Sequence, residues 1–407
     1  MATNRSACVL ALVCLTGLPF AGFSAASAAE LFGPYGGEVT FNARFRLEHV
    51  DQQGVNRTAD ANTARIALGY RTPWMGAFQA FVEGEVVESL GSARFNSTVN
   101  NRTTYPTVVD PDTVELNQGY IRFDGFPDTR VVAGRQVINV ANQRHIGAAA
   151  FRQNHQTFDA LRVTNRSVGK VTVDTFYSPE VHRIFGRRSA AGSFNTDLAV
   201  LNVAIKPRPE IGISAYGHLF DIDDVPAQSS KTFGVRLSAK RQIGTWAGTL
   251  NAEVARQSDY GNNQTGFDAG YYVLEPAVAK GPFTLRAKVA MIDGRGDAAF
   301  QFPFGTNHAF QGWADKFLNT PVGGIREQAI AAVYKVPPGT LLAGIVGIAS
   351  VHRFTSDSGD RYGQELDLRL AKSLSKGVTV SAKLADYKAD GFSVDTQKWW
   401  LTLALSF

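Results

Sequence analysis

Short segments in which apolar and polar side chains alternate recur from about residue 38 to the C-terminus. In residues 38–50, Val39 and Phe41 share one face of such a segment, whereas Arg44 and Arg46 share the other. Similar segments cover residues 77–87, 231–240, 283–291, 377–387 and 399–407. A period of two predicts a β-strand whose two faces meet different surroundings. The chain is therefore expected to fold into a sheet with one apolar and one polar side.

The connections between these segments are of two kinds. Turn-like links lie at residues 72–74, 125–128, 167–169, 207–209, 242–244, 281–282, 337–339 and 375–377. Long polar stretches lie between them, at residues 51–62, 89–112, 139–154, 179–195 and 293–324. Short turns at one rim and long loops at the other are typical of outer-membrane barrels.

We predict an all-β fold, a transmembrane antiparallel up-and-down β-barrel of about 18 strands with short periplasmic turns and long extracellular loops. Sixteen strands remain an alternative, because residues 114–123 and 271–280 show no clear alternation. A soluble β-sandwich is disfavoured, because each polar face carries several ionisable side chains that a water-filled lumen tolerates and a packed core does not. A β-solenoid is disfavoured because the sequence has no short fixed-period repeat.

The N-terminus has the features of a secretory signal peptide over residues 1–28. A single arginine precedes an apolar stretch, and residues 26–28 supply the small side chains that a signal peptidase requires. Both cysteines, Cys8 and Cys14, lie in this segment, so the exported chain would contain no disulfide. Residues 29–407 are expected to form a single barrel domain.

Composition and motifs exclude several other classes of protein. The net charge of the 407-residue chain is only +5 and its basic residues are scattered, which argues against binding to nucleic acid. No apolar run beyond the N-terminus reaches the roughly 18 residues of a membrane helix. Motifs of hydrolases, zinc enzymes and phosphate-binding loops are absent, and the histidines lack metal-ligand spacing. We therefore expect no enzyme, no metal and no other cofactor, and interpret the acidic residues 221–224 and 357–360 as solvated turns.

Ionisable side chains on the polar faces are predicted to line the lumen. The basic ones are Arg44, Arg46, Arg65, Arg71, Arg162, Arg236, Lys240, Arg286, Lys288, Arg369 and Lys383. The acidic ones are fewer: Glu48, Glu83, Glu85, Asp174, Glu365 and Asp367. An excess of bases in a narrow pore raises the local concentration of anions. Any single base could equally pair with an acid across strands and brace the wall.

Two stretches carry a resemblance to a known family. Residues 134–162 contain Gly-Arg-Gln, Phe-Arg-Gln and Gln-Thr-Phe-Asp-Ala-Leu-Arg, and residues 304–317 read FGTNHAFQGWADKF. Together they resemble the alginate-export family of outer-membrane porins. The resemblance implies a monomeric barrel of 18 strands, an arginine-rich constriction and passage of an anionic uronate polymer.

The same two stretches supply candidate residues for the pore mouth. Four arginines are expected to converge there: Arg135, Arg144, Arg152 and Arg162. Asp159 is expected to hold one guanidinium group in a bidentate pair. The second stretch is a long loop with aromatic residues, among them Trp313, which would either narrow the pore and stack on sugars or form an extracellular flap.

These features favour a passive, anion-preferring outer-membrane channel for export of an acidic polysaccharide such as alginate, or for passage of its oligomers. Three alternatives are kept: a porin for small organic anions or nutrients, a membrane-embedded hydrolase, and a structural barrel with a plugged lumen. The expected partners are outer-membrane lipid, lipopolysaccharide and the barrel-assembly machinery, which would recognise the C-terminal Phe407.

Overall fold

The computed structural model describes residues 36–407, so the predicted signal peptide and both cysteines lie outside the described residues. Eighteen β-strands are formed. The first nine are β1 (Glu38–Gln52), β2 (Ala59–Arg71), β3 (Phe78–Ser89), β4 (Thr113–Phe126), β5 (Thr129–Gln136), β6 (Thr157–Asn165), β7 (Val171–His182), β8 (Ser193–Arg208) and β9 (Ile211–Ile222). The other nine are β10 (Ser230–Ile243), β11 (Trp246–Asp259), β12 (Asp268–Lys280), β13 (Phe283–Ile292), β14 (Ile325–Lys335), β15 (Val346–Thr355), β16 (Arg361–Ser375), β17 (Val378–Ala389) and β18 (Thr396–Ser406).

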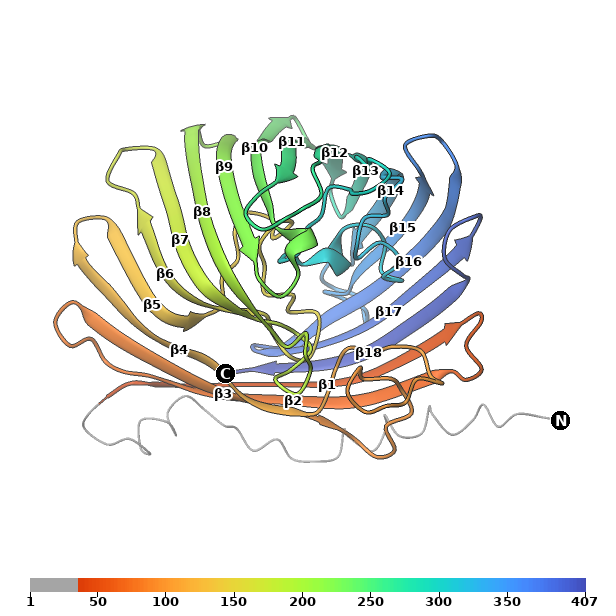
Figure 1. The fold of residues 1–407 in the computed structure, drawn as a ribbon, viewed down its shortest axis with the longest axis horizontal. Helices are drawn as coiled ribbons and strands as arrows, with labels where there is room; N and C mark the ends of the chain where they lie inside the picture. Colours follow the sequence, from red (N-terminus) through yellow and green to blue (C-terminus); the bar gives the residue numbers. More distant parts are fainter. Residues whose placement is uncertain (1–35) are drawn as a thin grey trace.

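The strands form one closed antiparallel sheet (Figure 1). Each strand pairs with its neighbours in the sequence, and β1 also pairs with β18, so the sheet has no open edge. Closure extends to the last residue, because the backbone N–H groups of Phe41 and Phe407 each donate to the other residue's carbonyl oxygen at 2.9 Å. The predicted all-β barrel is confirmed, with 18 strands rather than 16. Among residues 36–407, no helix has the length and apolar character needed to cross a membrane.

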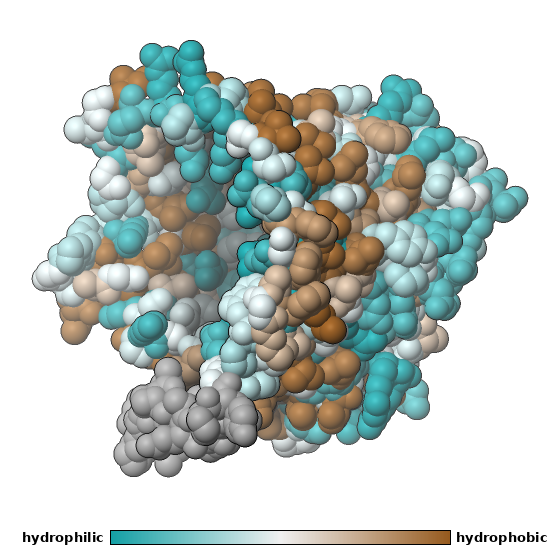
Figure 2. Space-filling view, turned by 90° about the vertical axis from the view of Figure 1, so that its left-hand side faces the viewer, coloured by the Kyte–Doolittle hydropathy of each residue, from teal (hydrophilic) through white to brown (hydrophobic). Residues whose placement is uncertain are grey.

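The outer face of the barrel is apolar and the inner face is polar, as the alternation predicts. Leu68, Phe233 and Leu285 are 53–59 % exposed on the outside, whereas Arg65 and Glu85 are buried inside. Figure 2 shows hydrophobic side chains grouped over the outer surface, beside a hollow with hydrophilic side chains at its margin. A surface immersed in lipid around a polar interior requires this arrangement.

β4 contains the segment that lacks a clear alternation in the sequence. A β-bulge at Asn117 shifts its pairing with β3 beside Glu83. Before the bulge, even-numbered residues such as Leu116 face outward; after it, odd-numbered residues such as Ile121 do. The side-chain amides of Asn117 and Gln118 both donate to Glu83, at 2.6 and 3.0 Å. The irregularity is thus a local extra residue, and the strand itself is continuous.

β12 is the other segment without a clear alternation. It alternates regularly, with Tyr272, Leu274 and Val278 exposed on the outer face. Its inward positions include Val273 and Ala277, which are also apolar. The sequence therefore shows no contrast between the two faces, although the strand has both.

The two rims differ in the length of their connections. One, the short-turn rim, contains both ends of the barrel sheet and links such as residues 127–128 and 281–282. The link between β14 and β15, residues 336–345, is an exception at this rim. A short turn is predicted at its Pro-Pro-Gly sequence, but the observed link is longer. Two adjacent prolines cannot donate to the strand ladder, which ends β14 early. The other, the long-loop rim, carries the longest connections, at residues 90–112, 137–156 and 293–324.

Two of these loops fold into the lumen (Figure 1), and we call residues 137–156 the first inner loop and residues 293–324 the second inner loop. They contact each other, because Ile146 and Phe304 form a backbone bridge. Both side chains are fully buried in one cluster with Phe158 and Phe220 of the wall. Of the two arrangements predicted for the second loop, the structure has the one in which the loop enters the lumen.

Phe304 is the residue whose removal should most weaken the docking of the second inner loop. Phe304→Ala deletes a fully buried ring that lies 5.2 Å from the Phe220 ring, and should lower the free energy of unfolding by about 3–5 kcal/mol. Leu341→Ala, in the 336–345 link where Leu341 is 94 % exposed, should change it by less than about 0.5 kcal/mol. Urea unfolding in lipid vesicles measures both values. Equal effects would contradict the docked loop.

Candidate functional site

A basic stretch of the inner wall runs over β16, β17, β1 and β2. Strand pairing sets Arg44 directly opposite Arg65, and Arg369 directly opposite Lys383. All four lie on the inward-facing set of their strands. Like charges at directly paired positions repel each other and destabilise a sheet. Of these four bases, only Arg65 forms an ion pair with a carboxylate of the described residues, that of Glu85.

The first inner loop packs against this wall through its carbonyl groups. Arg44 donates to the backbone oxygens of Ala150, Phe151 and Arg152 at 2.7, 3.2 and 3.0 Å. Arg46 donates to the Phe151 oxygen at 2.6 Å. Carbonyl oxygens carry only partial charges, so these contacts position the two guanidinium groups without neutralising them.

Arg152 ties the first inner loop to the wall and to the second inner loop. Its guanidinium group lies 3.3 Å from Glu48, 3.8 Å from Asp110 and 3.3 Å from Asp315. Burial alone would lower the pKa of Arg152, but the three carboxylates outweigh burial and raise it. Asp110, on the loop after β3, also lies 3.5 Å from Arg46. Arg152 is therefore a structural cation, shielded from the lumen by acids.

Asp315 is the corresponding anion of the second inner loop. Besides Arg152 it contacts His308 at 2.6 Å and Lys398 at 2.8 Å. Burial would raise the pKa of Asp315, but these cationic and hydrogen-bonding neighbours hold it well below its usual range. His308 Nδ1 faces Asp315, and its Nε2 lies within hydrogen-bond reach of the Lys383 ammonium group. A ring that donates from Nδ1 and accepts at Nε2 must be neutral.

Aromatic rings surround the Lys383 ammonium group. It lies 3.9 Å from the centre of the Trp313 ring, 4.6 Å from Phe151 and 5.1 Å from Trp400. Phe151 in turn stacks on His308 with ring centres 3.5 Å apart. Trp313 thus lies in the lumen as part of the second inner loop. The site offers a cation beside flat apolar surfaces.

Arg144 lies deep inside the packed loops, so it cannot meet a solute at the pore mouth as predicted. Its side chain is 1 % exposed, and its guanidinium group lies 3.5 Å from the centre of the Phe302 ring and 4.7 Å from Phe310. Burial lowers the pKa of Arg144. The rings of Phe302 and Phe310, in the second inner loop, cover the Arg144 guanidinium group.

Several predicted lumen bases instead brace the wall by pairing with acids. Arg162 forms a bidentate pair with Asp174, at 2.8 and 2.7 Å. The other such pairs are Arg65–Glu85, Arg71–Glu38, Arg236–Glu253 and Lys288–Glu327. In each pair the acid offsets the base, and all of these side chains are on inward-facing positions, with Arg71 and Glu38 at the short-turn rim. These residues contribute little to a net positive potential.

Arg286 and Arg369 remain without such a partner. Within residues 36–407, neither side chain forms a hydrogen bond or an ion pair, although both lie on inward-facing positions of β13 and β16. Lys240, near the short-turn rim of β10, is exposed and equally free. Arg44 and Lys383 also form no ion pair with a carboxylate in this part of the chain, whereas Arg46 lies 3.5 Å from Asp110.

Arg135 and Asp159 do not line the lumen, contrary to expectation. They are paired with each other across β5 and β6, in register with the outward-facing residues Ala133 and Leu161. Asp159 does hold Arg135 in a bidentate pair, at 2.8 and 2.9 Å. The four arginines of the pore-mouth prediction therefore divide among three places: the outer wall, the packed loops and a braced pair on the inner wall.

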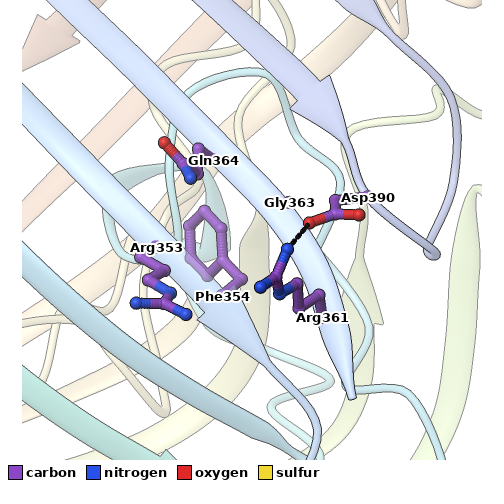
Figure 3. A pocket seen from close by; sticks show the side chains of 6 residues that line it. All are labelled: Arg353, Phe354, Arg361, Gly363, Gln364 and Asp390. Atoms are coloured by element: carbon purple, nitrogen blue, oxygen red, sulfur yellow. Dashed lines mark hydrogen bonds and ion pairs between the residues drawn. The ribbon is translucent and has the colours of Figure 1, made fainter. Parts of the chain in front are cut away.

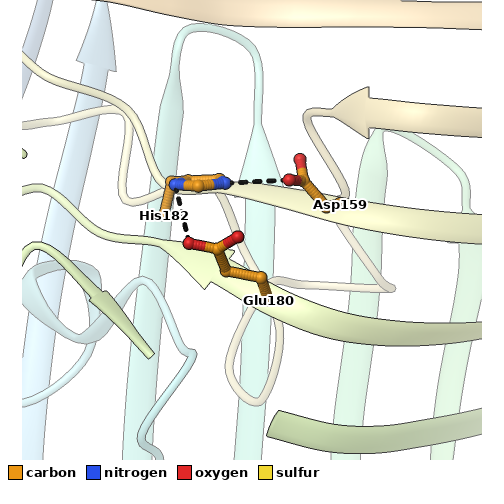
Figure 4. A group of neighbouring side chains, drawn as sticks. All are labelled: Asp159, Glu180 and His182. Atoms are coloured by element: carbon orange, nitrogen blue, oxygen red, sulfur yellow. Dashed lines mark hydrogen bonds and ion pairs between the residues drawn. The ribbon is translucent and has the colours of Figure 1, made fainter. Parts of the chain in front are cut away.

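Asp159, Glu180 and His182 lie close together on this outer wall (Figure 4). His182 bridges the two carboxylates, at 3.1 Å from Asp159 and 3.8 Å from Glu180. Three such groups could hold a metal ion, but Asp159 is already occupied by Arg135. We interpret the group as an ion-pair network at the end of β5–β7.

Sequence reasoning missed the residues that fix the loops in the lumen. Asp110, His308 and Asp315 lie on loops, and Lys398 lies on β18, and all four are buried or half-buried. The alternation of strands carries no information about loop residues. The only available signal was the dense polar and aromatic stretch at residues 304–317, which contains His308 and Asp315.

Acidification should weaken the folded state through His308. Burial lowers the pKa of His308 from 6.5 to about 3, so between these pH values the unfolded chain binds a proton there and the folded chain does not. The free energy of unfolding should fall as the pH drops, by up to about 1.4 kcal/mol per pH unit from this group. His308→Gln should reduce the slope between pH 7 and pH 5, measured by urea unfolding. An unchanged slope would argue against a neutral, buried ring.

Similarity to solved structures places the fold among known proteins. No family model matches the chain, and no curated protein matches it in sequence, so neither comparison supports the resemblance to the alginate-export family. Solved structures do match. Acinetobacter baumannii OccAB4 is 14% identical with a TM-score of 0.71, covering 92% of this chain and 100% of its own. Pseudomonas aeruginosa OpdK, solved with vanillate, is 12% identical with a TM-score of 0.70, covering 91% and 98%.

A third match has the same character. Pseudomonas aeruginosa OccK8 is 14% identical with a TM-score of 0.71, covering 91% of this chain and 98% of its own. The chain therefore has the 18-strand fold of outer-membrane porins and is a multi-pass barrel of the outer-membrane type.

Proposed function

We propose that this barrel is a passive outer-membrane channel that prefers small organic anions, above all carboxylates. The observation that carries the proposal is a set of inward-facing bases without an ion-pair partner among residues 36–407, in which Arg369 faces Lys383 at directly paired positions and Arg286 lies on β13. Like charges at paired positions lower the stability of a sheet, so their presence calls for a functional reason. In a pore, unpaired bases raise the local concentration of anions, which supplies that reason.

The arginines are suited to brief binding of carboxylates. Arg286 and Arg369 each present a planar fork of donors that matches a carboxylate. Because neither has a partner within the described residues, a passing carboxylate displaces no existing ion pair. Such contacts lower the barrier to entry without retaining the solute.

The two inner loops favour small solutes over a polymer. Arg152 and Asp315 join the loops at 3.3 Å, and the backbone bridge between Ile146 and Phe304 joins them a second time. The joined loops occupy part of the lumen, which restricts a polymer chain more than a small solute. We therefore set the alternative of a porin for small organic anions above export of alginate.

The surroundings of Lys383 suggest that aromatic carboxylates are among the solutes. A flat ring could stack near Trp313 and Phe151 while its carboxylate meets Lys383 or Arg369. Vanillate, with which the OpdK structure was solved, is a small aromatic carboxylate. That similarity of fold supports this solute class.

Neutralising the free arginines should slow the uptake of anions selectively. Arg369→Gln and Arg286→Gln each remove about 0.6–1 kcal/mol of attraction, which is roughly three- to fivefold in the swelling rate of liposomes supplied with vanillate or benzoate. The rate for a neutral solute of similar size should stay unchanged. Arg241→Gln is the matched control, because Arg241 is exposed on the outer face of β10 without an ion pair.

Equal slowing by Arg241→Gln, or equal slowing for neutral solutes, would contradict anion preference. No swelling with any solute, from protein shown to be folded, would favour the plugged structural barrel.

Releasing the second inner loop should enlarge the solutes that pass. Asp315→Asn leaves Arg152 and Lys398 buried without their shared anion, which costs about 3–5 kcal/mol. We expect larger neutral oligosaccharides to enter liposomes with this variant and not with the wild type. Asp297→Asn, at an exposed position of the same loop, is the control. Identical size limits for both variants would show that the loop does not set the pore width.

A further inference from the structure

Outward-facing arginines near the long-loop rim are generally paired with acids. The pairs are Arg94–Asp60, Arg135–Asp159, Arg256–Asp268 and Arg326–Asp357. Arg353 of β15 differs, because its exposed side chain forms no hydrogen bond or ion pair with any residue from 36 to 407. An isolated guanidinium group on the outer wall of a membrane barrel needs an explanation.

Strand pairing shows how far Arg353 lies from the two rims along the barrel axis. Directly paired outward positions across β14–β17 form a polar row: Gln328, Arg353, Gln364 and Lys388. In the next row toward the short-turn rim, Ile330, Val351 and Leu366 of β14–β16 are 40–56 % exposed and apolar, and the position on β17 is Asp386. Arg353 therefore lies where the lipid-facing apolar surface ends, at the level of lipid headgroups.

Arg353 also lines a cleft with a second arginine. Figure 3 shows Arg353 on β15 and Arg361 on β16 at this cleft, together with Phe354, Gln364 and the carboxylate of Asp390. Arg361 is 69 % exposed in its side chain and touches Asp390 at 3.4 Å. Among the residues that line the cleft, two guanidinium groups meet one carboxylate, a net charge of +1. The adjoining Lys388 contacts two carboxylates, those of Asp386 and Asp395.

We propose that this cleft binds the phosphate group of a headgroup in the outer leaflet, of the phosphorylated glycolipid type found in lipopolysaccharide. Long loops face the outside in barrels of this kind, so the cleft lies in the outer leaflet. Arg353 and Arg361 would each donate to phosphate oxygens, and the amide of Gln364, which also lines the cleft, would donate a further hydrogen bond. The apolar row below receives the acyl chains. The site is independent of what passes through the lumen.

The experiment uses the folded full-length barrel in detergent. Binding of a lipid A-type glycolipid is measured by native mass spectrometry for the wild type and for Arg353→Gln combined with Arg361→Gln. We expect the double variant to bind at least about tenfold more weakly, the loss expected for one or two charge-assisted contacts. Arg353→Lys combined with Arg361→Lys, which keeps both charges, should retain most of the binding. Arg241→Gln, an unpaired outward arginine near the short-turn rim, should bind like the wild type.

Two further probes separate the source of the phosphate. The same glycolipid with its phosphates removed should bind the wild type no better than the double variant. Inorganic phosphate at millimolar concentration should not displace the lipid, since the lipid also contacts the apolar row. Undiminished binding by the double variant, tight binding of the dephosphorylated lipid, or displacement by inorganic phosphate would each overturn the proposal. Heat-modified gel mobility checks that every variant is folded.

Discussion

The structure depends on one constraint: a strand surrounded by lipid must have every backbone group paired. Closure of β1 onto β18 meets it, down to the paired backbone groups of Phe41 and Phe407. Once closed, an alternating strand has only one place for its polar side chains, the interior. The charged lumen is therefore a direct consequence of closure, and the sequence decides only which charges it contains.

Inside this wall, charge is distributed unequally. Most acids of the lumen form ion pairs that fix part of the structure. Asp174 pairs with Arg162 on the neighbouring strand, and Asp315 pairs with Arg152 between the two inner loops. Some bases are not used in this way, notably Arg286 and Arg369. The small positive net charge of the chain thus becomes a local excess on particular stretches of the wall. The inner loops bring Trp313 and Phe151 against that wall, which adds flat apolar surfaces to the cations.

The sequence predicted the barrel well because its signal is repeated in every strand. Strand number, closure and the inward orientation of residues such as Arg44 and Arg286 follow from a period of two. The prediction failed where that period is interrupted. The bulge at Asn117 shifts the alternation of β4 halfway along the strand, so the sequence shows no clear period there. Arg135 was predicted to lie at the pore mouth, but its register with Asp159 places it on the outer face. The docking of the inner loops depends on contacts more than a hundred residues apart, such as Arg152 with Asp315, which no local pattern contains.

The most direct test of the account is the reversal potential of single channels in a planar bilayer under a gradient of KCl. An excess of unpaired lumen bases predicts a potential that lies toward the chloride equilibrium potential, and a smaller displacement at high salt, where charges are screened. A reversal potential on the potassium side, or none at all in an open channel, would contradict the claim that the free arginines set the selectivity of this pore.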